Sequence, residues 1–325
     1  MICEKIHVNE NNDKVILTTY LTDTSLEMTG DRKKPAVLIL GGGAYFSVSD
    51  SEGEPVALRF SAMGYQAFTL KYSTYGVDAF IRGFQNMERR RNTEHPEPVR
   101  DVARAVKYIY EHAEEWRVDK KKIIICGFSA GAHNAAMYLT HWYDMKLMGE
   151  LGCDPEVLKP AAGILSYPIT DYVFMKQAIE EGRTDRAFFG ASDMAFVGTK
   201  EPTDKLLQEI SPARAVSDKT PPCFIWTTSA DKMVPAENSL LMAMALAKAG
   251  VPYELHVFEE GDHGLSLADQ SSAAALDQIR DDVHQWVGLA ESWLKKRFSI
   301  EMPPAFRYED ADKAIAGAVG LETGE

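Results

Sequence analysis

The sequence predicts an α/β protein with a mostly parallel, doubly wound sheet of about eight strands. Short apolar runs alternate along the chain with segments in which apolar residues recur at helical spacing. Some runs, such as 36–40 and 123–126, contain no polar residue, which is typical of strands buried on both faces. Strands that alternate with helices in this way form a parallel sheet with helices over both faces.

The elements follow from local signals taken in chain order. Two short strands at 4–8 and 14–21 flank a polar turn, and a glycine run ends the strand at 36–40. Residues 118–122 are expected to connect a helix to the strand at 123–126. The other expected strands are 65–72, 161–168, 222–227 and 252–258, and the expected helices are 55–63, 98–116, 130–141, 202–210, 236–249 and, as one long amphipathic helix, 276–294.

Residues 1–298 are predicted to form one domain that carries two small cap insertions. These lie near 73–96 and 169–212, where the sequence shows no clear period, and the second is expected to act as a partial lid. The last stretch, 299–325, is richer in proline, glycine and acidic residues, so we expect an appendage rather than part of the core.

Charge and cysteine usage narrow the classes of partner and cofactor. A net charge of −13 argues against a nucleic acid or an anionic membrane as partner. The four cysteines are scattered without a CxxC pair, so neither a zinc site nor a redox pair is indicated. Residues 1–5 lack the apolar core of a signal peptide. We expect a cytoplasmic protein without metal or organic cofactor, and a homo-oligomer stays open.

The first candidate for chemistry is Ser129, which lies between Gly127 and Gly131 in a G-x-S-x-G pattern. The pattern follows a β-branched run and opens a helix, which is the arrangement that holds a nucleophilic serine on a strained turn. The alternative is a plain strand–helix turn. His133 lies one helical turn further and cannot easily receive the Ser129 proton, so we interpret it as a structural or pocket-lining residue.

A serine nucleophile needs a general base and a group that orients this base. His263 follows the strand at 252–258, between Gly261 and Gly264, and a parallel sheet places its site residues at such strand ends. Asp231 follows the preceding strand and can hold the histidine in the required tautomer. The alternatives are a surface-loop histidine and a helix N-cap aspartate.

Backbone amides are expected to stabilise the oxyanion. Ala130 directly follows Ser129, and the loop after the strand at 36–40 contributes Gly42 and Gly43. A glycine loop after a strand can also bind phosphate, but this one lacks the G-x-G-x-x-G spacing and a P-loop lysine.

From about residue 35 to 297 the chain resembles the α/β-hydrolase superfamily, in which the order Ser129, Asp231, His263 is the usual one. It resembles most the acetyl-xylan-esterase-type carbohydrate esterases, near the hormone-sensitive-lipase-like and feruloyl-esterase-like proteins. In one departure, Leu40 precedes the glycine run and Ala44 follows it, which leaves open which two loop amides face the oxyanion. The matching stretches are 49–57, 64–68, 126–131, 226–235 and 261–264.

The resemblance implies a serine carboxylesterase that removes short acyl groups, with acetylated sugars or xylo-oligosaccharides as the expected substrates. Tyr45, Asp50, Tyr72 and Tyr167 are candidate substrate-binding residues, and core packing is the alternative for the three tyrosines. Three other functions stay open: a serine peptidase on small peptides, a general carboxylesterase or lipase-like enzyme of non-carbohydrate substrates, and a non-catalytic binding module.

Overall fold

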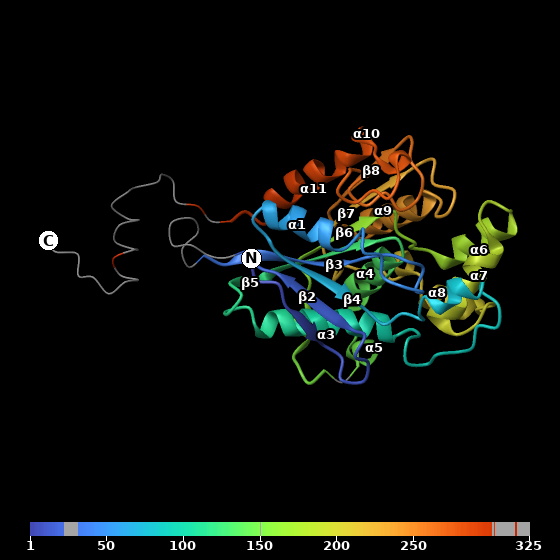
Figure 1. Cartoon of the computed structure of the whole chain (residues 1–325), viewed down its shortest axis with the longest axis horizontal. Helices are drawn as coiled ribbons and strands as arrows, with labels where there is room; N and C mark the ends of the chain where they lie inside the picture. The colour runs from blue at the N-terminus through green and yellow to red at the C-terminus, as the bar shows by residue number, and fades with distance from the viewer. Residues whose placement is uncertain (23–31, 150, 301, 303–315, 317–325) are drawn as a thin grey trace.

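An eight-stranded sheet organises the computed structural model, which describes residues 1–22, 32–149, 151–300, 302 and 316 (Figure 1). The strands lie in the order β1-β2-β4-β3-β5-β6-β7-β8, with β1, β2 and β4 paired antiparallel and the rest parallel. The predicted sheet is confirmed. Its strands are β1 (Lys5–His7), β2 (Ile16–Tyr20), β3 (Lys34–Leu40), β4 (Gln66–Lys71), β5 (Val118–Phe128), β6 (Ala162–Ser166), β7 (Cys223–Thr228) and β8 (Tyr253–Phe258).

Helices cover both faces of the sheet, and each face has its own apolar core. In β3, Val37 and Ile39 point to one core, whereas Leu38 and Leu40 point to the other. The helices α1 (Glu54–Ala62) and α11 (Trp286–Lys295) pack on the first side. The second side is covered by α3 (Glu97–Glu111), α4 (Ala130–His141) and α9 (Glu237–Ala249). Because helices bury both faces of the sheet, central strands such as β3 contain continuous runs of apolar residues.

Three helices occupy the second predicted insertion, where the sequence suggested only one. They are α6 (Tyr172–Glu180), α7 (Arg186–Val197) and α8 (Asp204–Glu209), and they gather beyond one end of the sheet (Figure 1). The side chains of Asp171, Asp185 and Thr203 accept hydrogen bonds from backbone amides of the first helical turns. These N-caps are the sequence signal that the expectation overlooked. The first insertion contains α2 (Asp78–Ile81).

Two other predicted elements are corrected. Residues 118–122 belong to β5 itself, because Lys34 of β3 pairs with Val118 before a bulge shifts the register. The expected helix 276–294 is broken into the 3-10 turn Leu276–Gln278, α10 (Asp281–His284) and α11. Arg280 is extended because its amide donates to the carbonyl of Ala268, 2.9 Å away. Leu276 is 87% exposed, so it never belonged to an apolar face.

The remaining short elements are α5 (Met145–Met148) and the 3-10 turns Pro155–Leu158 and Pro212–Arg214. Most of the predicted appendage, 299–325, lies outside the described residues.

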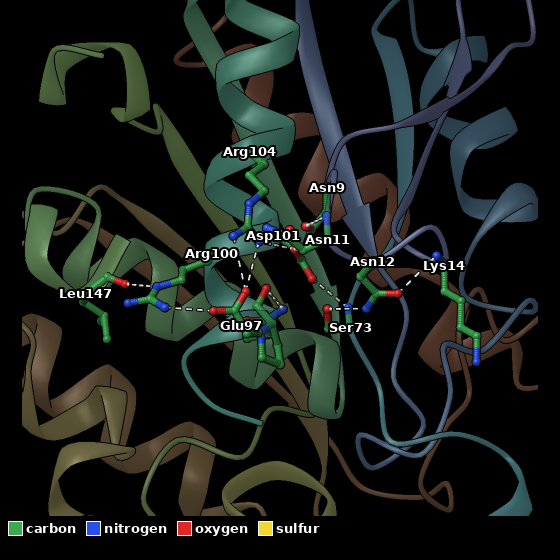
Figure 2. A network of polar contacts seen from close by, with 12 residues as sticks. Asn9, Asn11, Asn12, Lys14, Ser73, Glu97, Arg100, Asp101, Arg104 and Leu147 are labelled. Carbon is green, nitrogen blue, oxygen red and sulfur yellow. Dashed lines mark hydrogen bonds and ion pairs between the residues drawn. The ribbon is translucent and has the colours of Figure 1, made fainter. Parts of the chain in front are cut away.

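A buried carboxylate anchors the start of the first insertion (Figure 2). Asp101 of α3 is fully buried, and one oxygen accepts hydrogen bonds from the Asn9 side chain at 2.8 Å and from Arg104 at 2.5 Å. Its other oxygen accepts from the backbone amide of Ser73 at 2.8 Å. The network joins the turn after β1, the end of β4 and helix α3, so the loop that leaves β4 starts from a fixed point.

A buried histidine connects α4 to the loop after β3. His133 is fully buried, its Nδ1 accepts a hydrogen bond from the Tyr45 hydroxyl at 2.5 Å, and its Nε2 donates to the carbonyl of Ile210 at 2.8 Å. The neutral ring satisfies both partners. Burial lowers the pKa of His133 to about 3, against an ordinary value of 6.5.

We expect the His133→Gln variant to lose less stability than the wild type as the pH falls. In the wild type, His133 becomes protonated below about pH 6.5 in the unfolded chain but stays neutral in the folded chain. Below that pH, this residue therefore lowers the free energy of unfolding by about 1.4 kcal/mol for each unit by which the pH falls. The variant lacks this pH-dependent loss of stability, because glutamine does not titrate. Urea unfolding of both proteins from about pH 7 to about pH 4.5 measures the difference in slope. Parallel pH profiles would contradict this prediction.

Candidate active site

Ser129 lies at a sharp corner between β5 and α4. Its φ of 51° and ψ of −120° are unusual for a residue with a side chain. A Cβ on Gly127 would lie 2.4 Å from the carbonyl oxygen of Gly131, and a Cβ on Gly131 would lie 2.1 Å from that of Leu40. Both glycines are therefore required by close backbone approach, and the corner lifts the Ser129 side chain above the end of the sheet.

The structure brings Ser129, His263 and Asp231 together in one chain of hydrogen bonds. The distance from Ser129 Oγ to His263 Nε2 is 2.7 Å, and that from His263 Nδ1 to Asp231 Oδ2 is 2.6 Å. The imidazole is 11% exposed and the carboxylate 1%. Because an ionised carboxylate only accepts, Nδ1 carries the proton and Nε2 is free to accept one from the serine.

The loops after β7 and β8 hold the two partners of Ser129 in place. The other oxygen of Asp231, Oδ1, accepts hydrogen bonds at 2.9 Å from the amides of Met233 and Val234. Asp231 therefore caps its own loop as well as orienting the imidazole. On the other side, Gly261 and Gly264 have φ values of +129° and +86°, which a side chain would strain, and they turn the His263 loop inward.

The glycine loop offers different amides from those expected. The Gly42 amide donates to a carboxylate oxygen of Glu52 at 2.6 Å, so it is not available to a substrate, which corrects its predicted role. Gly43 and Ala44 line the pocket beside Ser129, and no described residue accepts a hydrogen bond from either amide. Ala130 is the first residue of α4, where an amide has no partner within the helix.

A pocket of about 310 Å³ opens beside Ser129 and His263. The cap insertions supply much of its wall, because Phe80 belongs to α2 and both Phe188 and Phe189 belong to α7. Its other apolar lining residues are Ala44, Ile169, Met233 and Val234. The pocket is at the small end of the range for ligand sites and is mainly apolar.

None of the four predicted substrate-binding residues lines this pocket. Tyr45 is buried against His133, and the hydroxyl of Tyr72 donates to the carbonyl of Gly41 at 2.8 Å. The hydroxyl of Tyr167 donates to Glu52 at 2.6 Å. The side chain of Asp50 is 88% exposed, 3.1 Å from Lys71, and faces a different hollow between β4 and α1. The alternative of core packing therefore applies to the three tyrosines.

Sequence reasoning overlooked Glu52, which is 4% exposed and close to the site. Burial raises its pKa, although its bonds to Tyr167 and Gly42 and the nearby His263 act in the opposite direction. A glutamate in the polar turn after the glycine loop gives no local sign that its side chain turns inward.

Within the part of the chain that the structure describes, no group of three or more His, Cys, Asp or Glu side chains is placed to hold a metal ion. No helix among the same residues has the length and apolar character needed to cross a membrane.

Comparison with known proteins identifies similar sequences. The BD-FAE family model matches residues 22–246. Endo-1,4-beta-xylanase B of Butyrivibrio fibrisolvens is 35% identical over 243 residues, which cover 74% of this chain and 34% of that protein. The acetylxylan esterase of Xylanibacter ruminicola is 25% identical over 255 residues, which cover 78% of this chain and 45% of that protein. The chain thus spans less than half the length of these curated relatives.

Solved structures show the same architecture over nearly the whole chain. An acetyl ester-xyloside bifunctional hydrolase from Caldicellulosiruptor lactoaceticus is 30% identical with a TM-score of 0.69, covering 90% of this chain and 96% of that one. An alpha/beta hydrolase from a Medee basin deep-sea metagenome is 31% identical with a TM-score of 0.67, covering 91% and 97%. A carboxylesterase from Lactobacillus plantarum WCFS1, at 24% identity, shares the fold with a TM-score of 0.73, covering 93% and 100%.

We expect Gly131→Ala to destabilise the protein by about 3 kcal/mol or more, because overpacking against rigid backbone exceeds the usual cost of an added methyl group. The new Cβ would meet the carbonyl oxygens of Leu40 and Gly41 at 2.1 and 2.4 Å. The matched control is Gly288→Ala in α11, where a Cβ meets nothing within 4 Å and should stabilise the helix by up to about 1 kcal/mol. Thermal unfolding of both variants checks this, and equal midpoints would contradict it.

Proposed function

This chain belongs to the BD-FAE family, and we propose that it is a serine carboxylesterase that removes acetyl groups from acetylated sugars or short xylo-oligosaccharides. The observation that supports the reaction type is the pair of short contacts from Ser129 to His263 and from His263 to Asp231. The support for the substrate class comes from two similar proteins, which are called an acetylxylan esterase and an acetyl ester-xyloside hydrolase.

In the proposed mechanism, Ser129 Oγ attacks the ester carbonyl while His263 Nε2 takes its proton. Asp231 holds the imidazole in the tautomer that accepts this proton and stabilises the imidazolium that forms. The amides of Gly43 and Ala130 bind the oxyanion of the tetrahedral intermediate. The imidazolium then protonates the leaving alcohol as the C–O bond breaks, and a water molecule releases the acid from the acyl-enzyme by the same steps.

A general carboxylesterase with apolar acyl groups is the second candidate. It is favoured by the apolar wall of the pocket, which includes Phe80, Phe188 and Phe189. The cytoplasmic location expected from the sequence is compatible with both candidates, and it favours short oligosaccharides over intact polymer as sugar-ester substrates.

Ser129→Ala should abolish acetate release from acetylated xylo-oligosaccharides and from p-nitrophenyl acetate. We expect kcat to fall by about 10⁴-fold or more, because the remaining groups cannot replace a nucleophile. The control is Ser292→Ala, an exposed serine of α11, which should keep full activity. Hydrolysis of aminoacyl-anilides by the wild type would instead favour a peptidase, and activity retained by Ser129→Ala would exclude the proposed mechanism.

Phe188→Ala should widen the pocket and shift the preference toward longer acyl chains. We expect the ratio of kcat/KM for p-nitrophenyl butyrate over acetate to rise by about tenfold, which is the effect of one or two methylenes in an apolar pocket. Phe174→Ala is the matched control, because Phe174 lies in α6 and does not line the pocket. An unchanged ratio in Phe188→Ala would show that this wall does not limit the acyl group.

A further inference from the structure

We infer that Glu52 is a positioning residue that couples the glycine loop to the His263 loop, and this inference rests on the proposed function of Ser129. Glu52 lies in the turn between the glycine loop and α1, and it makes no contact with the triad that would let it take part in proton transfer. Its two carboxylate oxygens instead bind one group on each side of the site.

The first arm of this connection runs to the glycine loop. Glu52 Oε2 accepts the Gly42 amide at 2.6 Å, which is short even for a bond to a charged acceptor. A Cβ on Gly42 would lie 2.7 Å from the Cβ of Ser129, so the loop passes directly beside the nucleophile. By fixing the peptide between Gly41 and Gly42, the carboxylate sets where the following amide, that of Gly43, points relative to Ser129.

The second arm runs to the histidine loop through Tyr167. Glu52 Oε1 accepts a hydrogen bond from the Tyr167 hydroxyl at 2.6 Å, and the same hydroxyl oxygen accepts one from the amide of Ser266 at 3.0 Å. Ser266 is three residues after His263. The ring of Tyr167 also packs edge-on against the imidazole, with ring centroids 5.0 Å apart.

The turn that carries Glu52 has a direct connection to the same loop. Ser266 Oγ donates to the carbonyl of Ser51 at 2.7 Å, and the carbonyl of Ser266 accepts the indole N–H of Trp286 at 3.0 Å. The backbone of Ser266 is held with a φ of 52°. The His263 loop is therefore fixed to the glycine-loop side of the site as well as to Asp231.

A carboxylate is the side chain that this position requires. Two donors converge on it, the Gly42 amide and the Tyr167 hydroxyl, and a carboxylate offers an acceptor to each. A glutamine of the same shape has one acceptor and one donor, so it can satisfy only one of them. Burying a charge is costly for stability, and satisfied buried networks specify one geometry. A role in placing the site accounts for a charge at this position.

Glu52→Gln is the main test. We expect kcat for p-nitrophenyl acetate to fall about 10- to 100-fold with KM within about twofold, because loss of an oxyanion donor costs about 10²- to 10³-fold and a misdirected amide should cost less. Phenylboronic acid, which forms a tetrahedral adduct with a nucleophilic serine, should bind more weakly by the same factor. A merely structural role would lower the thermal midpoint and leave the boronate Ki unchanged.

The matched control is Glu54→Gln, two residues further and exposed, which should keep wild-type kcat and Ki. Tyr167→Phe removes only the connection from Glu52 to the His263 loop and should lower kcat about 3- to 10-fold. This variant also tests the inference if Glu52→Gln does not fold. Combining both substitutions should cost no more than Glu52→Gln alone, because they interrupt one connection.

Two outcomes separate this inference from the proposed function. If the wild type shows no hydrolysis that depends on Ser129, the proposed function fails. If hydrolysis depends on Ser129 but Glu52→Gln and Tyr167→Phe keep the wild-type kcat/KM and boronate Ki, only the role of Glu52 is overturned.

Discussion

The close approach of the α4 N-terminus to the end of β3 is the constraint on which the site depends. With Gly131 against the carbonyls of Leu40 and Gly41, the helix begins directly over the central strands. Ser129 is then forced into its unusual backbone conformation, and the glycine loop after β3 runs beside it. One backbone contact therefore places both Ser129 and the loop amides, because β3 and β5 are neighbours in the sheet.

The partners of Ser129 come from loops at the same edge of the sheet. The loops after β7 and β8 bring Asp231 and His263, and the turn after β3 brings Glu52. The two cap insertions then close the site, with α2 and α7 supplying aromatic walls. The helices of the second insertion start from side-chain N-caps, and the Asp101 network fixes where the first insertion leaves β4, so the pocket wall has a rigid base.

The comparisons agree with the resemblance that the sequence predicts. Membership of the BD-FAE family and similarity to an acetylxylan esterase confirm the likeness to acetyl-xylan-esterase-type carbohydrate esterases and to α/β hydrolases. The solved structures are covered almost completely, whereas the curated relatives are much longer than this chain. What is shared is thus the hydrolase fold and the family.

The sheet, the order of its strands along the chain and the candidates Ser129, Asp231 and His263 could all be predicted from the amino-acid sequence. Glycines, apolar runs and strand ends are local signals, because the structure that they predict depends mainly on the backbone of neighbouring residues. The directions in which Tyr167 and Glu52 point, and the hydrogen bond that occupies the Gly42 amide, depend on how the chain folds in three dimensions. Each of these features depends on a partner more than nine residues away in the sequence. The identity of a polar residue does not reveal whether its side chain faces a pocket, the core or solvent.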